Sequence, residues 1–116
     1  MTTTAQTRRV VSAYHAARTA GDLDAASVYL APPFNFQSPM MGFDSPGTYL
    51  ARHRAFQQLV TGLDMISELY GEGEATLVYD LHTATPAGTQ RTAEHFRVTA
   101  GKISSILVIF DASPWR

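Results

Sequence analysis

The chain has 116 residues, 45% of them hydrophobic and 16% charged, and its net charge is −1. A chain of this length and hydrophobicity is expected to form one globular domain, residues 1–116, with a single core. The nine lysines and arginines are scattered, which argues against a nucleic-acid partner, and the absence of cysteine excludes disulfides and thiolate metal sites.

Three helices are predicted in the first half of the chain, over residues 3–20, 22–31 and 45–61. Each begins at a residue type that caps helices, and the first carries apolar residues at helical spacing. Gly21 ends the first helix, and Pro32-Pro33 ends the second because proline lacks the N–H that a helix needs. The first half of the chain is therefore predicted to be mainly helical.

Strands dominate the second half, where apolar residues recur at every second position. A short strand at 34–37 precedes the third helix, and four strands follow it, at 65–70, 74–84, 90–99 and 103–111. Turn-forming residues separate these four segments, as in an antiparallel sheet. Helices followed by consecutive strands predict an α+β fold with the helices on one face of the sheet.

Neither a signal peptide nor a membrane-spanning segment is predicted. The opening residues, MTTTAQTRR, lack the apolar core of a signal peptide, and no apolar run approaches membrane-spanning length. We therefore expect a cytoplasmic protein that has no membrane partner.

The last strand, with the sequence ISSILVIF, is apolar on both of its alternating faces. One face is expected to meet the helices or a pocket, so the other, carrying Ile103, Leu107 and Ile109, needs separate cover. We expect that cover to be a second copy of the chain, because twofold dimers are the commonest assembly. The alternative is that the C-terminal segment folds back, with Trp115 over this face.

Glu94 shares its strand face with Phe96 and Val98, so its carboxyl is expected to be buried. A buried carboxyl either pairs with a base or stays protonated, and the pattern places no lysine or arginine on this face. We therefore predict a pKa well above that of an exposed glutamate. The alternative is that Glu94 pairs with Arg91 at the surface, or with a residue of a neighbouring strand.

Tyr14 lies on the apolar stripe of the first helix. A tyrosine in that position either packs in the core, with its hydroxyl bonded nearby, or directs its hydroxyl at a ligand.

Two segments, VVSAYHAARTAGDLDAA at 10–26 and AEHFRVTAGKI at 93–103, resemble the steroid Δ-isomerase branch of the nuclear transport factor 2-like (NTF2-like) superfamily. SnoaL-like cyclases belong to the same superfamily. The resemblance implies a cone: three N-terminal helices packed on a curved antiparallel sheet that encloses an apolar pocket. It also implies that Tyr14 and a protonated Glu94 donate hydrogen bonds to an enolate oxygen, as the two oxyanion donors of that family do.

The chain departs from this family at the general base, because Ser38 stands where the isomerases have an aspartate before proline. A neutral hydroxyl does not shuttle protons between carbon atoms without a partner base. Asp80 is the best remaining acid-base candidate, and alternatively a rim residue paired with His82 or His95. In the related epoxide hydrolases, a looser resemblance, an aspartate falls at Asp80.

The partner residues of those epoxide hydrolases are missing, however. Their arginine would fall at Val78 and their second acid at Val108, so epoxide hydrolysis is not expected.

Metal binding is also not expected. The possible ligands Asp80, His82 and Glu94 lack the helical histidine pairs or thiolates of common metal sites. His53 lies on the apolar stripe of its helix, a position typical of a histidine packed in the core. No cofactor is expected either.

Three hypotheses for function remain open. The first is an enzyme that isomerises, cyclises or dehydrates a largely apolar carbonyl compound through an enolate, and the second is a non-catalytic protein that binds a hydrophobic ligand. The third is an interaction subunit whose pocket is vestigial. In the first two, the expected pocket residues are Phe34, Phe36, Ser38, Met40, His53, Phe56, Val78, His82, Phe96, Ile106, Val108 and Phe110.

Overall fold

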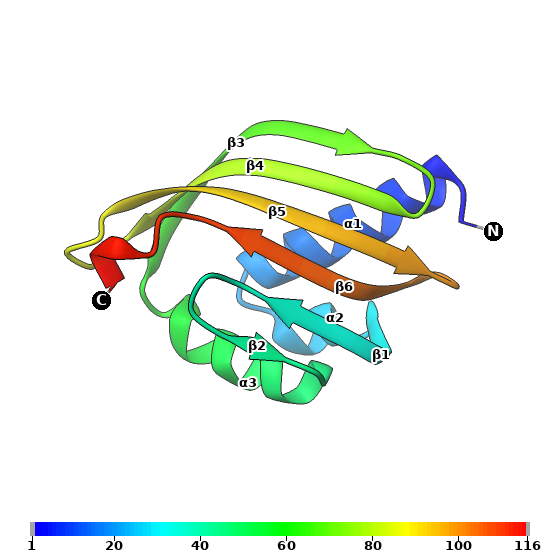
Figure 1. The fold of residues 1–116 in the computed structure, drawn as a ribbon, viewed down its shortest axis with the longest axis horizontal. Helices are drawn as coiled ribbons and strands as arrows, with labels where there is room; N and C mark the ends of the chain where they lie inside the picture. Colours follow the sequence, from blue (N-terminus) through cyan, green and yellow to red (C-terminus); the bar gives the residue numbers. More distant parts are fainter. Residues whose placement is uncertain (1, 116) are drawn as a thin grey trace.

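A six-stranded curved sheet with three helices forms the molecule, as a computed structural model of residues 2–115 describes it (Figure 1). The predicted α+β class, with helices packed on a curved sheet, is confirmed. The elements in chain order are α1 (Thr4–Thr19), α2 (Leu23–Ser27), β1 (Leu30–Gln37), β2 (Gly42–Phe43), α3 (Pro46–Gln57), β3 (Val60–Tyr70), β4 (Glu74–Thr83), β5 (Thr89–Thr99), β6 (Lys102–Ile109) and a 3-10 turn (Ser113–Trp115).

The strands lie in the order β2-β1-β6-β5-β4-β3. Strand β1 runs parallel to β6, and every other neighbouring pair is antiparallel. Helix α1 crosses behind the strands in Figure 1, and α3 lies beside β1 and β2. The face that α1 covers is called the inner face below, and the opposite face the outer face.

Local sequence signals account for where two of the helices begin. The Thr3 hydroxyl accepts a hydrogen bond from the Gln6 backbone N–H at 3.1 Å, while the Gln6 side chain accepts from the Thr3 N–H at 2.8 Å. Ser45 caps α3 by accepting from the Thr48 N–H at 3.3 Å. These bonds satisfy N–H groups that have no partner inside the helix.

Strand pairing moves two of the predicted helix ends. Helix α2 ends at Ser27, and the Pro32-Pro33 segment belongs to strand β1, where pairing with β6 is interrupted between Leu30 and Asn35. Proline fits this interruption because it has no N–H to donate. Helix α3 ends at Gln57 rather than Thr61, because β3 already pairs with β4 from residue 60.

A register shift in β6 corrects one predicted face. Arg97 pairs with Ser105, but Val98 pairs with Ile103, so the β6 strand carries one extra residue at this point. Ile103 therefore turns to the inner face and is fully buried, whereas it was expected on the outer face. Leu107 and Ile109 do lie outside, with 39% and 57% of their surface exposed.

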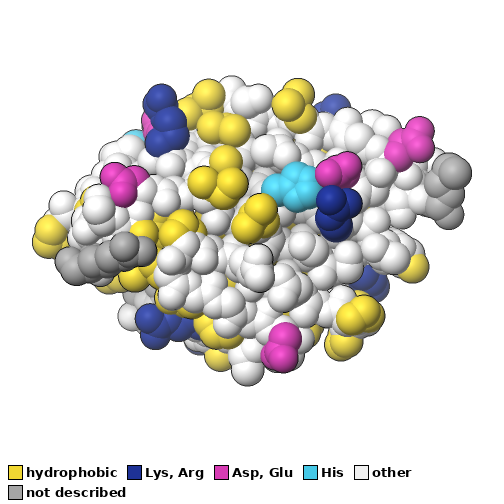
Figure 2. All heavy atoms as spheres, viewed as in Figure 1, with side chains coloured by type: hydrophobic (Ala, Val, Ile, Leu, Met, Phe, Trp, Pro, Cys, Tyr) yellow, Lys and Arg dark blue, Asp and Glu magenta, His cyan; other side chains and the backbone are white. Residues whose placement is uncertain are grey.

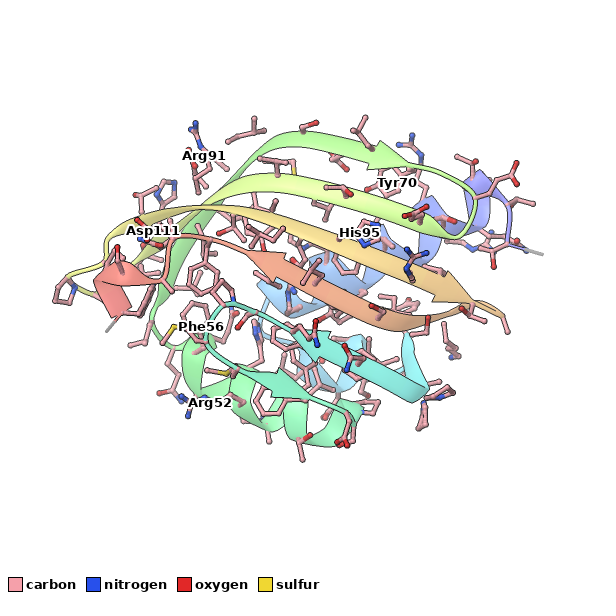
Figure 3. The ribbon with its side chains drawn as sticks, in the orientation of Figure 1. Arg52, Phe56, Tyr70, Arg91, His95 and Asp111 are labelled. Atoms are coloured by element: carbon pink, nitrogen blue, oxygen red, sulfur yellow. The ribbon has the colours of Figure 1, made fainter. Side chains whose placement is uncertain are left out.

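The outer face is mixed rather than uniformly apolar. Figure 2 shows scattered hydrophobic side chains over the sheet, with a histidine beside an acidic and a basic side chain near the middle. In the same orientation Figure 3 labels His95 there, and its Nε2 lies 2.9 Å from Glu74. No helix within residues 2–115 is long and apolar enough to cross a membrane.

Candidate functional site

A cavity of about 840 Å³ opens between the inner face of the sheet, α1, α3 and the C-terminal turn. Phe56 lies between α3 and the sheet, while Arg52 of the same helix points outward (Figure 3). Seven of the residues expected in a pocket line this cavity: Phe36, Ser38, Met40, His53, Phe56, Val108 and Phe110. The cavity walls are mainly aromatic and aliphatic, as in small-molecule sites.

Other residues expected in the pocket lie elsewhere. Phe34, Phe96 and Ile106 are buried in the core and do not line the cavity. Val78, Asp80 and His82 lie on the outer face, because the inner face of β4 carries the odd-numbered residues from Ala75 to Thr83. Their assignment to the pocket is wrong. The even-numbered residues of β4 were expected on the inner face, and they lie on the outer face.

Asp80 consequently has a surface role. Its carboxylate accepts two hydrogen bonds from Arg91, at 2.9 and 3.0 Å, and this bonding lowers the pKa of Asp80. His82 bonds instead to Thr89 and to Asp64, each at 2.8 Å. Asp80 is therefore not a candidate acid or base for a ligand in the cavity.

The possible metal set is also separated. Asp80 and His82 lie on the outer face of the sheet, whereas Glu94 lies on the inner face. Within residues 2–115 no three histidine or carboxylate side chains converge as metal ligands would.

The polar floor of the cavity is built around a buried ion pair between α1 and β5. Arg18 Nη1 and Nη2 donate to the two carboxylate oxygens of Glu94, at 2.5 and 2.7 Å. The Glu94 side chain is fully buried, and that of Arg18 is 6% exposed. This two-pronged geometry is the strongest form of arginine–carboxylate pairing.

The predicted burial of Glu94 is confirmed, but its predicted protonation is wrong. Burial alone would raise the pKa of Glu94, yet the charge of Arg18 and its hydrogen bonds lower that pKa to about 2. Glu94 is therefore an anion that accepts hydrogen bonds, and it does not donate one to an enolate. The partner comes from helix α1, which the alternation of the strand alone did not reveal.

Three tyrosines extend this buried network. The Tyr79 hydroxyl donates to Glu94 Oε1 at 2.7 Å, and the hydroxyls of Tyr14 and Tyr49 lie 2.5 Å apart. Arg18 Nη1 contacts both of the latter hydroxyls, at 3.4 and 3.3 Å. Burial is the main cause that raises the pKa of each phenol, so all three stay protonated at neutral pH.

Tyr14 and Glu94, the two residues expected to contact a ligand, are fully buried and do not line the cavity. The side chains that do reach it from this network are His15, Arg18, Tyr49 and Tyr79. The sequence contained one signal for Arg18, since it follows Tyr14 by four residues and so shares its helix face. Tyr49 and Tyr79 carried no comparable signal.

His15 adjoins this network and is buried, with 8% of its surface exposed. Its Nδ1 lies 2.8 Å from Arg18 Nη2, and its ring packs against Tyr79 with centroids 5.4 Å apart. Burial, followed by the charge of Arg18, lowers the pKa of His15 to about 4. The imidazole is therefore uncharged at neutral pH.

Ser38 lies at the other end of the cavity, in the turn between β1 and β2. Its Oγ accepts hydrogen bonds from the backbone N–H groups of Met40 and Met41, each at 3.2 Å. These bonds give the serine a structural role in shaping the turn. No carboxylate lies within hydrogen-bond distance of Ser38 among the described residues to activate it.

Solved structures identify the fold, whereas no protein-family model and no curated protein matches the sequence. A Kribbella flavida DSM 17836 protein is 29% identical, with 92% of this chain and 88% of that chain covered and a TM-score of 0.85. An NTF2-like protein from Cytophaga hutchinsonii ATCC 33406 is 20% identical over 99% and 96% of the two chains, with a TM-score of 0.80. A ketosteroid isomerase-like protein, also from Kribbella flavida DSM 17836, is 17% identical over 90% and 77%, with a TM-score of 0.74. The chain therefore has the NTF2-like fold, and the predicted resemblance is confirmed at the level of the fold.

Proposed function

We propose that this NTF2-like domain binds a small, largely apolar molecule in the cavity between the sheet and α3. The observation that carries the proposal is the cavity itself, with a volume of about 840 Å³ and mainly apolar walls. Small-molecule sites typically have volumes of about 300–1,000 Å³ and a few convergent polar groups. Here four polar side chains, His15, Arg18, Tyr49 and Tyr79, converge in one region, called the floor below.

The charge of the floor favours an uncharged ligand. Arg18 is paired with Glu94, so their charges cancel, and the buried histidines and tyrosines are neutral at pH 7. Arg52 also lines the cavity, but it is exposed and points outward, where water screens its charge (Figure 3). A largely apolar ligand with few polar atoms fits these walls, because it buries no charged group without a partner.

A matched pair of substitutions on one strand tests this proposal. Val108 lines the cavity, whereas its neighbour Leu107 faces outward and is 39% exposed. Val108→Trp fills part of the cavity, so we expect it to weaken binding of 2-ethylnaphthalene at least about tenfold, the loss of roughly 1.4 kcal/mol of contact. Leu107→Trp adds the same side chain outside and is expected to leave the affinity unchanged.

Binding is measured by calorimetry, because each variant adds a second tryptophan to Trp115, the sole tryptophan of the wild-type chain, and so complicates a fluorescence readout. Equal affinities for wild type and Val108→Trp, with both proteins folded by circular dichroism, would show that the probe binds elsewhere.

Enolate chemistry of the isomerase or cyclase type is a second candidate function. The observation that favours it is that Ser38 lines the same cavity as His53, whose pKa burial lowers to about 4. His53 is therefore a neutral imidazole at pH 7, and its lowered pKa makes it a weak base on its own. A Ser38→Asp variant would add a carboxylate base near the reacting carbons of a bound ketone.

The test compares wild type with Ser38→Asp on a small β,γ-unsaturated ketone, followed by conjugated-enone absorbance. A positioned base typically raises a rate about 10²–10⁴-fold, so a gain of that size is expected. A Ser38→Asp protein that binds the ketone without any gain in rate would rule out a substrate facing position 38.

A further inference from the structure

Three side chains that line the cavity each carry a ring nitrogen that has no hydrogen-bond partner among residues 2–115. These nitrogens are Nε2 of His15, Nε2 of His53 and Nε1 of Trp115, and each atom is buried. They come from three different elements, α1, α3 and the C-terminal turn. Buried polar atoms are nearly always hydrogen-bonded, so three unpartnered nitrogens around one cavity indicate a polar group on its ligand.

The protonation of His15 follows from its neighbour. Arg18 Nη2 lies 2.8 Å from His15 Nδ1, and a guanidinium donates hydrogen bonds but accepts none. Nδ1 must therefore be the unprotonated nitrogen, which places the proton of the neutral ring on Nε2. The unpartnered atom at the floor is thus a donor, held in place by the Arg18–Glu94 pair behind it.

The terminal nitrogens of Arg18 are already occupied. Nη1 donates to Glu94 and contacts two tyrosine hydroxyls, while Nη2 donates to Glu94 and His15. A ligand carboxylate at the floor would have to break the ion pair or lie close to the Glu94 carboxylate without a compensating charge. A neutral oxygen acceptor avoids both costs.

We infer that the ligand carries an uncharged oxygen acceptor, such as a carbonyl, ether or hydroxyl oxygen, that accepts a hydrogen bond from His15 Nε2–H at the floor of the cavity. This inference rests on the proposed binding function and adds the chemistry of the ligand's polar end. His15 is then the specificity-determining residue, and the Arg18–Glu94 pair acts through it as a positioning element.

Three probes of the same shape test the inference: 2-acetylnaphthalene, which has the carbonyl, 2-ethylnaphthalene, which lacks it, and 2-naphthoate, which is charged. The measured quantity is the ratio of ketone to hydrocarbon affinity, by calorimetry, in wild type, His15→Phe and His95→Phe. In His15→Phe we expect this ratio to fall about tenfold while the hydrocarbon affinity is retained, because the ketone oxygen loses its donor and a buried polar group left unpaired costs about 1–3 kcal/mol.

His95→Phe is the matched control. It makes the same substitution on the outer face, where His95 bonds to Glu74, and is expected to leave the ratio unchanged. An unchanged ratio in His15→Phe, or tighter binding of 2-naphthoate than of the ketone, overturns the inference while the proposed binding function stands. If neither the ketone nor the hydrocarbon binds wild type, the proposed function itself fails and the inference fails with it.

A second measurement avoids the substitution, because His15→Phe also removes the acceptor of an Arg18 N–H and could impair folding. Long-range ¹H–¹⁵N NMR of the wild-type protein reports the tautomer of His15 directly. We expect Nε2 to be protonated, and its proton to move downfield with 2-acetylnaphthalene but not with 2-ethylnaphthalene. A proton on Nδ1, or an equal response to both probes, overturns the inference.

Discussion

The two faces of strands β4 and β5 place similar side chains in opposite environments. Glu94 and the adjacent His95 belong to the same strand, yet Glu94 is fully buried against Arg18, while His95 bonds to Glu74 at the surface. Asp80 also pairs with an arginine, but that arginine, Arg91, is 73% exposed. The same acid–base chemistry therefore has large energetic consequences inside the sheet and small ones outside, because water screens the outer pairs.

Removing the buried carboxylate tests this contrast with the largest expected effect. Glu94→Gln leaves the Arg18 cation buried without a counter-charge, so we expect the free energy of unfolding to fall by about 3–5 kcal/mol. Urea denaturation followed by circular dichroism measures the loss. Asp80→Asn breaks the outer pair and is expected to change the urea midpoint little. Similar losses in the two variants would contradict the contrast between the faces.

Low pH is expected to destabilise the protein because of titratable groups buried on the inner side of the sheet. An unfolded histidine titrates near pH 6.5, whereas burial lowers the pKa values of His15 and His53 to about 4. Between these values the unfolded chain binds more protons, so the free energy of unfolding falls as the pH drops from 6.5 to 4. Below about pH 4.5 Glu94 adds a further loss, since its pKa in the folded state is about 2.

Urea denaturation at pH 7, 5 and 3.5 measures this dependence, and His53→Phe is expected to reduce the slope between pH 6.5 and 4. A free energy of unfolding that stays constant from pH 7 to 4 would mean that these histidines are not buried in the neutral form.

Replacing Tyr79 or Tyr14 with phenylalanine is expected to lower the free energy of unfolding less than Glu94→Gln does, and by different amounts. Tyr79 donates to an ionised carboxylate, so Tyr79→Phe is expected to cost about 1.5–3 kcal/mol, the range for hydrogen bonds to charged groups. Tyr14 bonds mainly to Tyr49, and Tyr14→Phe is expected to cost about 0.5–1.5 kcal/mol. Because Tyr14 does not line the cavity, its substitution should leave 2-acetylnaphthalene affinity unchanged. A large loss of affinity in Tyr14→Phe would restore Tyr14 as a ligand-contacting residue.

Substitutions on the outer face are expected to change the free energy of unfolding least, and to change the oligomeric state instead. We propose a homodimer through this face, supported by the exposed Leu69 on β3 and the exposed Leu107 and Ile109 on β6. Leu107→Asp would strand an ion in an apolar interface and is expected to yield monomers or aggregates with little change in the urea midpoint.

Light scattering measures the mass, with Val28→Asp as the control, since Val28 is also an exposed apolar residue, at 54%, but lies at the end of α2. A stable wild-type monomer at micromolar concentration would contradict the homodimer.

Much of the fold could be predicted because its signals are local. The capping box at Thr3 and Gln6, the serine cap at Ser45 and the alternation around Glu94 each depend on neighbouring residues, and the structure contains all three. The predictions failed where distant segments meet. Pairing of β1 with β6 shortened α2, and the register shift beside Val98 turned Ile103 inward.

For the site, the sequence alone determined that Glu94 is buried and that several aromatic side chains, Phe36, Phe56 and Phe110 among them, surround a cavity. Only the tertiary structure decided the charge of Glu94, because Arg18 lies 76 residues away in the chain and on a different element. It likewise decided that His15 is buried beside Arg18 and that Asp80 lies on the outer face, paired with Arg91. Burial follows from a residue's own pattern, whereas the pKa of a buried group depends on which partners the fold brings within hydrogen-bond distance.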